Sequence, residues 1–271
     1  LSILEERNFP VDNVYALASC RSVGTRILFK DDQLIVGDLR TFDFSLAEIG
    51  LFSAGASVSA IYAPKAVDAG CVVIDNTSQF RYEDDIPLVV SEVNPHAVGN
   101  YKNRGIIANP NCSTIQMLVA LKPIYDAVGI ERINVCTYQA VSGTGKAAIE
   151  QLNRDTMRML VGSMKTETLE MFKEMKLPNL VRDTMRELEK GLNVPSKKVY
   201  PKEIAFNVLP HIDAFQDNGY TKEEMKMVWE TQKIFEDDSI LVNPTAVRVP
   251  VYYGHSEAVH IETKEKIDVK T

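Results

Sequence analysis

Short apolar runs alternate with polar or helical stretches through the first 111 residues of the chain. The runs lie within residues 13–19, 51–55, 71–78, 87–94 and 105–111. Runs of this length that are rich in Val and Ile are typical of strands buried on both faces of a parallel sheet. Between two of them, residues 63–70 place Pro64 in a first helical turn and Gly70 at a C-terminal cap, which predicts a helix. The pattern therefore predicts a doubly wound α/β domain.

The first residues suggest that this domain is incomplete. Residues 1–7 read as the tail of an amphipathic helix with no initiator methionine, and the next apolar run ends at Ser19. A helix feeding such a strand matches the first βαβ unit of a dinucleotide-binding fold. Because no G-x-G-x-x-G motif occurs, we expect the first strand and its glycine-rich turn to be missing.

The pattern changes after residue 112. Residues 114–128 carry apolar positions at helical spacing, with Pro123 expected to bend the helix and Gly129 to end it. A β-rich run follows at 132–145, and a Met-, Glu- and Lys-rich stretch at 146–198 predicts helices whose Met side chains fill a core or a helix interface. Strands at 204–213 and 239–263 flank a predicted helix at 221–235. We predict two domains, 1–111 and 112–271.

Composition narrows the choice of partners. The 271 residues carry a net charge of −7 and no long basic run, which argues against nucleic acid or an anionic membrane surface as a partner. The four cysteines are far apart and form no C-x-x-C pair, so the sequence predicts neither a metal site nor a disulfide framework. With no signal peptide or apolar transmembrane run, a reducing cytoplasm fits best.

Cys112, in the stretch "NPNCST", is the leading candidate for chemistry. A buried structural thiol is the common role of such a cysteine. Here the cysteine follows a turn and directly precedes a helical pattern, and a helix N-terminus favours the thiolate. The preceding apolar run would deliver it to the carboxyl edge of the sheet, where a dinucleotide binds. A thiolate beside a nicotinamide predicts attack on an aldehyde, hydride loss and a thioester.

That chemistry requires a base, and the chain has four histidines. His255 is the best placed, because Gly254 allows a close approach and Arg248, seven positions earlier, could grip a carboxylate bidentately. A lone histidine in a strand region is more often structural, so this assignment depends on its neighbours. We assign structural roles to His96, His211 and His260.

These residues belong to a set of motifs that resembles the aspartate-semialdehyde dehydrogenase family. The resemblance runs over nearly the whole chain, through "LASCRSVG", "FSAGASVS", "VIDNTSQFR", "VSEVNPHA", "IIANPNCSTIQMLVALKPIYD", "YQAVSGTGK", "IAFNVLPHID", "NGYTKEEMKMVWETQKI" and "VRVPVYYGHSEAV". One motif alone would carry little weight, whereas their order together is highly specific. The resemblance implies a Rossmann-like dinucleotide-binding domain followed by an α+β catalytic and dimerisation domain.

The resemblance also implies roles for individual residues. Cys112 would be the nucleophile, His255 the acid/base, and Gln139 would orient the acyl intermediate. Arg248 would bind the substrate carboxylate and Glu223 its amino group. Phosphate would contact Lys226, Arg81 and Asn111. On the residues alone, Gln139 could simply hydrogen-bond a loop, and Glu223 and Lys226 at i,i+3 would form a solvated pair on a helix surface.

For the cofactor, Arg21 stands where an NAD enzyme usually has an acidic residue after the second strand. A cation flanked by the hydroxyls of Ser19 and Ser22 suits a 2′-phosphate, so NADP is expected, and the family uses it. Near the nicotinamide, the further cofactor contacts would come from Ser53, Gly55, Asn76, Ser78, Ser142 and Gly143. Gly and Ser in such turns are otherwise ordinary loop residues.

The implied reaction is the reversible, phosphate-dependent oxidation of L-aspartate 4-semialdehyde to L-4-aspartyl phosphate, which serves lysine, threonine, methionine and diaminopimelate synthesis. It needs no metal. The family forms homodimers or tetramers, and residues 146–204, longer than in common bacterial members, would help to build the interface. The chain also ends before the family's C-terminal return to the cofactor domain. The rival functions are an N-acetyl-γ-glutamyl-phosphate reductase, a glyceraldehyde-phosphate enzyme, and a non-catalytic dimerisation module.

Overall fold

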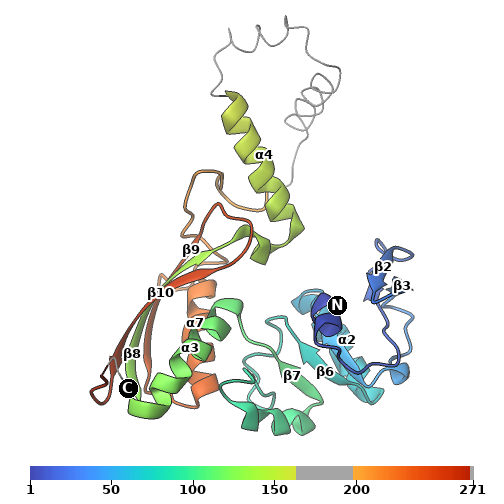
Figure 1. Cartoon of the computed structure of the whole chain (residues 1–271), viewed down its shortest axis with the longest axis horizontal. Helices are drawn as coiled ribbons and strands as arrows, with labels where there is room; N and C mark the ends of the chain where they lie inside the picture. The colour runs from blue at the N-terminus through green and yellow to red at the C-terminus, as the bar shows by residue number, and fades with distance from the viewer. Residues whose placement is uncertain (163–197, 269–271) are drawn as a thin grey trace, which may run out of the picture. The chain divides into compact units, whose positions relative to one another are not determined.

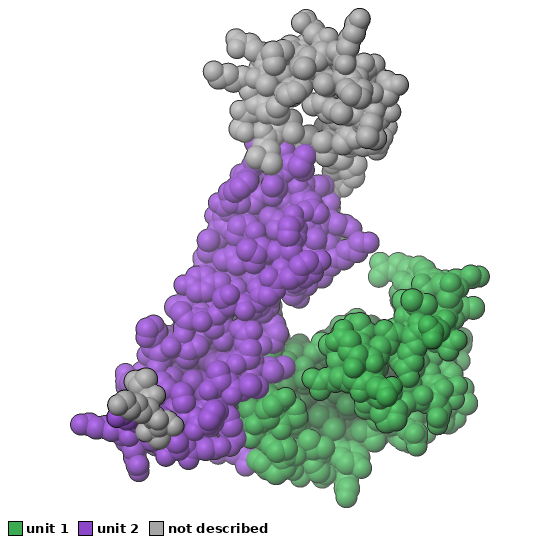
Figure 2. All heavy atoms as spheres, viewed as in Figure 1, with its two compact units in different colours: residues 1–111 green, residues 112–271 purple. Residues whose placement is uncertain are grey.

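The computed structural model describes residues 1–162 and 198–268. The chain divides into two compact units, Leu1–Asn111 and Cys112–Thr271, which Figure 2 colours separately. Each unit is described by itself below. None of the described helices combines the length and the apolar character that crossing a membrane requires.

The core of the first unit is a three-stranded parallel sheet, as the apolar runs predicted. It contains β5 (Ile49–Phe52), β6 (Val72–Asp75) and β7 (Ile106–Ala108), in the spatial order β5-β6-β7. Val73, Ile106 and Ala108 are almost completely buried. Helix α2 (Ala56–Asp68) packs against β5 and β6 (Figure 1). Parallel strands joined by a crossover helix are the elementary unit of an α/β fold, so the predicted fold class is confirmed for this unit.

The predicted helix at 63–70 is right at its end and wrong at its start. Pro64 lies inside α2, which begins at Ala56, eight residues before the proline and directly after Gly55. Proline lacks an N–H donor and usually disrupts a helix interior, which is why it favoured a helix start in the sequence. Gly70, with φ of +94°, follows the helix in a conformation that glycine adopts without strain.

Small elements surround this sheet in the first unit. Helix α1 (Ser2–Glu6) agrees with the predicted helical tail, and the predicted strand at 13–19 shortens to β1 (Leu17–Ala18). Strand β1 pairs in parallel with β4 (Gly37–Asp38), while β2 (Arg26–Phe29) and β3 (Asp32–Ile35) form an antiparallel hairpin. The 3₁₀ helices η1 (Phe44–Leu46) and η2 (Pro95–Asn103) complete the unit.

The predicted strand at residues 87–94 is wrong. Most of the segment is buried, with Ser91 and Glu92 exposed, but it contributes only an isolated bridge between Leu88 and Ala108. The Asn94 side chain accepts from the Val90 N–H at 2.9 Å and donates to the Leu88 carbonyl at 2.9 Å. These bonds fold the segment back on itself, because a side-chain amide replaces the backbone partners that a neighbouring strand would supply.

The second unit is built on a mixed sheet of three strands in the order β10-β8-β9. Strands β8 (Ile130–Gln139) and β9 (Leu241–Arg248) are parallel, and β10 (Ser256–Thr263) is antiparallel to β8. Helices α3 (Cys112–Val128) and α7 (Lys222–Phe235) pack on each other and against these strands (Figure 1). Burial alternates along β8, with Ile133, Val135 and Thr137 buried and Cys136 and Tyr138 exposed, so the helices cover one face only.

Local signals in the sequence explain the ends of these helices. Helix α3 ends at Gly129, whose φ is +66°, as predicted, and it continues through Pro123. Helix α7 starts with a capping box in which Thr221 and Glu224 exchange hydrogen bonds. The 3₁₀ turn η3 (Val141–Thr144) leads into α4 (Lys146–Gly162), in agreement with the helix predicted there. The rest of the Met-rich stretch, 163–197, lies outside the described residues.

The predicted strand at 204–213 is also wrong. Only Leu209 pairs with the sheet, through two backbone hydrogen bonds of 2.9 and 2.8 Å with Arg248. Phe206 and Asp213 adopt positive φ values of 54° and 67°, which break an extended backbone. The segment is instead a loop that packs through Ile204, Ala205 and Leu209 into an apolar cluster with Val141 and Tyr200.

Candidate active site

Cys112 is the first residue of α3, the position that its sequence context predicted. The residue keeps exposed surface, but desolvation is the largest influence on its thiol and raises the pKa above the usual value. Glu223 acts in the same direction, while backbone N–H groups at the helix start and the Arg248 guanidinium oppose it. The sequence predicted a lowered pKa for this thiol, and in the protein without ligands the pKa is instead raised, because the effect of burial exceeds that of the helix terminus.

His255 directly precedes β10 and is held by the backbone. The Ala140 N–H donates to its Nδ1 at 3.0 Å. Burial and the nearby Arg248 lower the imidazole pKa, against smaller opposite effects of Glu223 and of a backbone hydrogen bond with Gly254. The ring is therefore neutral at pH 7. Since Nδ1 accepts a hydrogen bond, the proton of the neutral ring lies on Nε2, and His255 presents a donor.

Arg248, the last residue of β9, is only 6% exposed. Its Nη1 donates to the Ala140 carbonyl at 2.8 Å, and its guanidinium lies 6.0 Å from the centre of the Tyr200 ring. Its Nε is enclosed and has no hydrogen-bond partner within the described chain. A buried donor without a partner is costly, and a carboxylate bound bidentately would satisfy it.

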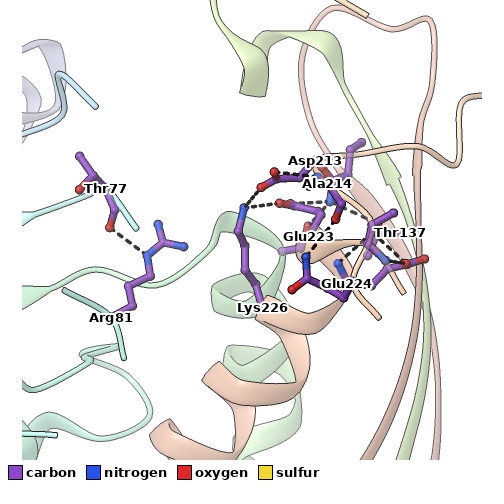
Figure 3. Close-up of polar contacts among 12 residues, drawn as sticks. Thr77, Arg81, Thr137, Asp213, Ala214, Glu223, Glu224 and Lys226 are labelled. Carbon is purple, nitrogen blue, oxygen red and sulfur yellow. Dashed lines mark hydrogen bonds and ion pairs between the residues drawn. The ribbon is translucent and has the colours of Figure 1, made fainter. Parts of the chain in front are cut away.

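Gln139, Glu223 and Lys226 form one buried polar network. Gln139 donates from Nε2 to Ser113 Oγ at 3.2 Å and to Glu223 Oε1 at 3.1 Å. The Lys226 amine lies between Glu223 Oε2, at 2.9 Å, and Asp213 Oδ2, at 3.1 Å (Figure 3). The alternative of a solvated pair is therefore wrong, because the side chains of Glu223 and Lys226 are only 9% and 12% exposed.

The charges in this network stabilise one another. Burial alone would lower the pKa of Lys226, but Glu223 and Asp213 outweigh it and raise that pKa. Glu223 also affects the thiol of Cys112 and the imidazole of His255, as does Arg248. The nucleophile, the imidazole, a carboxylate and a guanidinium thus lie within electrostatic reach of one another in the second unit.

The glycine-containing turn η3 lies close to His255 and Arg248. A Cβ placed on Gly143 would lie 3.3 Å from Cε1 and Nε2 of His255 and 3.4 Å from Nη1 of Arg248. The turn is held by the Ser142 N–H, which donates to the Tyr252 carbonyl, and by Tyr200, whose hydroxyl donates to Thr144 Oγ1 at 2.9 Å. Ser142 and Gly143, predicted as cofactor contacts, thus lie beside the predicted catalytic side chains.

In the first unit, several predicted cofactor residues gather at the carboxyl edge of the sheet. Asn76 follows β6, and its side chain donates to Ser53, which follows β5, at 3.5 Å, while accepting from Asn109, which follows β7, at 2.7 Å. Gly55, with φ of +103°, starts α2 at this edge. The buried Asp75 accepts from Ser59 and Thr77 at 2.8 and 2.7 Å, so it ties α2 to the turn that contains Ser78.

The other predicted residues of the first unit have less specific surroundings. Arg81 is buried and donates to the carbonyls of Thr77 and Asn76, both at 3.0 Å (Figure 3 draws the Thr77 bond), and Asn111 is buried at the end of the unit. Ser19, Arg21 and Ser22 lie in the turn that follows β1, where Arg21 is exposed. Their roles stay predictions.

Glu257 on β10 has a large pKa shift that the sequence did not predict. Burial raises the pKa of its carboxyl to about 7, although hydrogen bonds with Gln116 and Ser113 act against the shift. One signal could have found it: successive strand residues alternate faces, so residue 257 lies on the same face as His255. Asp213 and Tyr200, which contact Lys226 and Arg248, carried no such signal.

This shift predicts a pH dependence of stability. Because the folded state favours the neutral acid, protonation of Glu257 stabilises the fold. This stabilisation is complete below about pH 4.5 and is lost as the pH rises through about 7. Between pH 5 and 8, the wild-type free energy of unfolding should fall by roughly 1 to 2 kcal/mol more than that of Glu257→Gln, allowing for solvent screening. Urea unfolding at both pH values measures the difference, and equal slopes in the two proteins would contradict it.

Comparison with known proteins identifies the family. Residues 1–101 match the NAD-binding domain of semialdehyde dehydrogenases, and residues 121–271 match their dimerisation domain. The aspartate-semialdehyde dehydrogenase of Legionella pneumophila is 60% identical over 98% of this chain and 68% of its own length. That of Shewanella violacea is 58% identical over 100% of this chain and 72% of its own length.

A solved structure agrees with the sequence relatives. Aspartate-semialdehyde dehydrogenase II of Vibrio cholerae, crystallised as a complex with ASA, superposes with a TM-score of 0.86 at 55% identity, covering 100% of this chain and 71% of that one. The expected Rossmann-like and dimerisation domains are therefore both present. The rival assignment to an N-acetyl-γ-glutamyl-phosphate or glyceraldehyde-phosphate enzyme is set aside, and the chain belongs to the aspartate-semialdehyde dehydrogenase family.

Proposed function

We propose that Cys112 is the nucleophile with which this enzyme oxidises L-aspartate 4-semialdehyde to L-4-aspartyl phosphate, reversibly and with phosphate. One observation carries the assignment: Cys112 begins α3, and the Arg248 and Glu223 side chains that act on its thiol also act on His255. A thiol, an imidazole and a carboxylate-binding guanidinium in mutual reach are the parts that a thioester route requires.

The proposed oxidation proceeds in three steps. The sulfur of Cys112 bonds to the aldehyde carbon, and the thiol proton ends on the substrate oxygen. That carbon then loses a hydride and the hydroxyl loses its proton, which leaves a thioester on Cys112. A phosphate oxygen attacks the thioester, the C–S bond breaks, and the sulfur recovers its electron pair. Bound NADP⁺ would supply the hydride acceptor.

In these steps His255 would interact with the aldehyde oxygen of the substrate. Its Nε2–H can donate to the aldehyde oxygen and stabilise the charge that develops there. The basic position is Nδ1, which holds the Ala140 N–H. Full acid/base catalysis therefore requires the imidazole to release Ala140, whereas the donor role does not. The backbone bond with Gly254 favours the protonated ring that results.

The substrate would be held by charge. Arg248 would bind the α-carboxylate through its enclosed Nε edge, and Glu223 the amino group. Gln139, fixed by Ser113 and Glu223, would orient the acyl group. Lys226, Arg81 and Asn111 would bind phosphate. Lys226 already contacts two carboxylates, so it must exchange one of them for phosphate or contact all three.

NADP is the proposed cofactor. The exposed Arg21 between Ser19 and Ser22 suits a 2′-phosphate, and the edge formed by Ser53, Gly55 and Asn76 suits the nicotinamide half. Ser78, Ser142 and Gly143 are proposed as further cofactor contacts. Gly55 leaves the space above the start of α2 open, because no atom lies within 4 Å of a Cβ built there. A dinucleotide phosphate can approach such a helix start closely.

The enzyme is proposed to act as a homodimer, or as a tetramer of two dimers, in the cytoplasm. The face of the second sheet that α3 and α7 leave uncovered carries Tyr138, 45% exposed, and Leu241, 49% exposed. A second copy would bury these side chains. All four cysteines, Cys20, Cys71, Cys112 and Cys136, are free thiols, as a reducing compartment requires.

The assignment is tested by NADPH absorbance with protein expressed from the complete gene. With aspartate semialdehyde and NADP⁺, we expect NADPH to form only when phosphate is added, because phosphate releases the thioester. Arsenate should replace phosphate. If folded protein produces no NADPH at any phosphate concentration, the non-catalytic dimerisation module becomes the better description. NADPH formation at the same rate without phosphate would exclude the thioester–phosphate route.

A further inference from the structure

Glu257 lies on β10, the strand that His255 directly precedes, and the proposed mechanism does not use it. It is the second residue of β10, and the strand register sets it opposite Thr137 of β8, whose side chain is completely buried. Its carboxyl hydrogen-bonds with Ser113 and Gln116, in the first turns of α3. The carboxyl thus connects the outer strand of the sheet to the helix that begins with Cys112.

Ser113 extends this connection to Gln139. The Ser113 side chain is completely buried, and its Oγ accepts from Gln139 Nε2 at 3.2 Å. A hydroxyl has a single proton. When Glu257 accepts that proton, the lone pairs of Ser113 remain for the N–H of Gln139. The same amide nitrogen donates to Glu223 at 3.1 Å and lies 3.4 Å from Thr137 Oγ1, so acceptors on three sides select one orientation of the amide.

Placing an acidic side chain at position 257 costs free energy, because the carboxyl is largely removed from water. One carboxyl oxygen, Oε1, is enclosed and has no hydrogen-bond partner among the described residues. The cost of desolvating it shows in its raised pKa. Glutamine would fill the same volume and could reach the same two neighbours without a charge to desolvate. Above about pH 7, where the carboxyl of Glu257 is ionised, it offers two acceptors and no donor, so the hydroxyl of Ser113 must donate to it.

We propose that Glu257 is a positioning residue for the thioester step, which acts through Ser113 to orient the Gln139 amide and to fix the first turn of α3 beneath Cys112. The inference rests on the proposed function, since it assigns to Gln139 the placing of the acyl group. Glu257 itself contacts none of the reacting atoms. Its effect should therefore appear in the turnover of bound substrate and not in binding.

The kinetic test compares Glu257→Ala, Ser113→Ala and the double variant. Misplacement of a catalytic group costs roughly tenfold to a hundredfold in rate, so we expect such a loss in kcat for each single variant. The KM values for aspartate semialdehyde and phosphate should stay within about twofold, since Arg248 and Lys226 are untouched. The double variant should be no slower than the slower single one, because both substitutions break one connection. Glu257→Gln, which can accept one bond from Ser113, should recover part of kcat.

The matched control is Glu265→Gln, just beyond the same strand. Glu265 is exposed, so the kcat of this variant should equal that of the wild type. The proposal is overturned if Glu257→Ala retains wild-type kcat, if the two single losses multiply in the double variant, or if KM rises in step with the loss of kcat. Urea unfolding of each variant confirms that the compared proteins are folded.

A second measurement does not depend on activity. Alkylation of Cys112 by iodoacetamide, followed by mass mapping of its peptide, should be at least about threefold faster in Glu257→Ala than in the wild type, because a released first turn exposes the sulfur. Unchanged alkylation overturns the inference even if the enzyme is active. The two proposals can fail separately. If the wild type is inactive but Glu257→Ala still changes the alkylation rate of Cys112, the proposed function is overturned and the effect of Glu257 on Cys112 still holds.

Discussion

Cys112→Ser should abolish phosphate-dependent NADPH formation, with a loss in kcat of roughly 10³-fold or more. The hydroxyl of serine is a far weaker nucleophile than a thiolate, and the raised pKa of the Cys112 thiol shows that the site does little on its own to favour an anion. The substitution changes one atom at the start of α3, so binding of the substrate carboxylate by Arg248 should remain. Stopped-flow absorbance at 340 nm measures both the first turnover and the steady state.

Cys136 supplies the control for this substitution. It is also a free and exposed cysteine, but it lies on the uncovered face of β8. Cys136→Ser should keep wild-type kcat. A Cys112→Ser protein that retains more than about a tenth of the wild-type rate would be incompatible with a thioester on this residue.

His255→Ala should lower kcat by roughly 10²- to 10⁴-fold, the usual contribution of a general acid or base. Because burial and Arg248 lower the pKa of His255, the imidazole is neutral at pH 7. If the ring must accept a proton during the reaction, the activity of the wild type should fall at acid pH, where the ring is already protonated. That acid limb should be absent in the residual activity of the variant. Rates measured from pH 5 to 8 provide the comparison.

Glutamine at the same position separates the two roles of the histidine. Its side-chain amide can donate a hydrogen bond where Nε2–H of His255 does, but it cannot accept a proton. If donation to the substrate oxygen is the main contribution, His255→Gln should be about tenfold faster than His255→Ala. Equal rates of the two variants would show that proton transfer through Nδ1, after release of Ala140, is the main contribution. His260→Ala, exposed on the same strand, is the control.

The sequence predicted those parts of the fold that depend on local signals. The strands at β5, β6 and β7 follow from short apolar runs, and the start of α3 at Cys112 follows from the turn before it. The failures have a common cause. The segments at 87–94 and 204–213 are as apolar as strands, but Asn94 folds the first back through side-chain bonds to Val90 and Leu88, and positive φ at Phe206 and Asp213 breaks the second. Such local bends are not visible in the pattern of apolar residues.

The candidate site shows the same limit. Spacing and motifs located Cys112, Gln139, Arg248 and His255 in the chain. They could not show that Lys226 is buried between two carboxylates, since Asp213 comes from a loop thirteen residues away. Nor could they give the sign of the Cys112 pKa shift, because desolvation depends on what packs around a thiol and not on its neighbours in sequence.

The buried carboxylate of Asp75 has a consequence for how cofactor preference can evolve. Asp75 hydrogen-bonds both Ser59 of α2 and Thr77 beyond β6, so it ties together the edge that is proposed to hold the nicotinamide. Arg21, proposed to bind the 2′-phosphate, lies on an exposed turn that makes no bond to Asp75, Ser59 or Thr77 in the described contacts. On this proposal, mutations at Arg21 would change the preference between dinucleotides and leave the contacts of Asp75 unchanged. Cofactor recognition and hydride transfer would then be separable traits under selection.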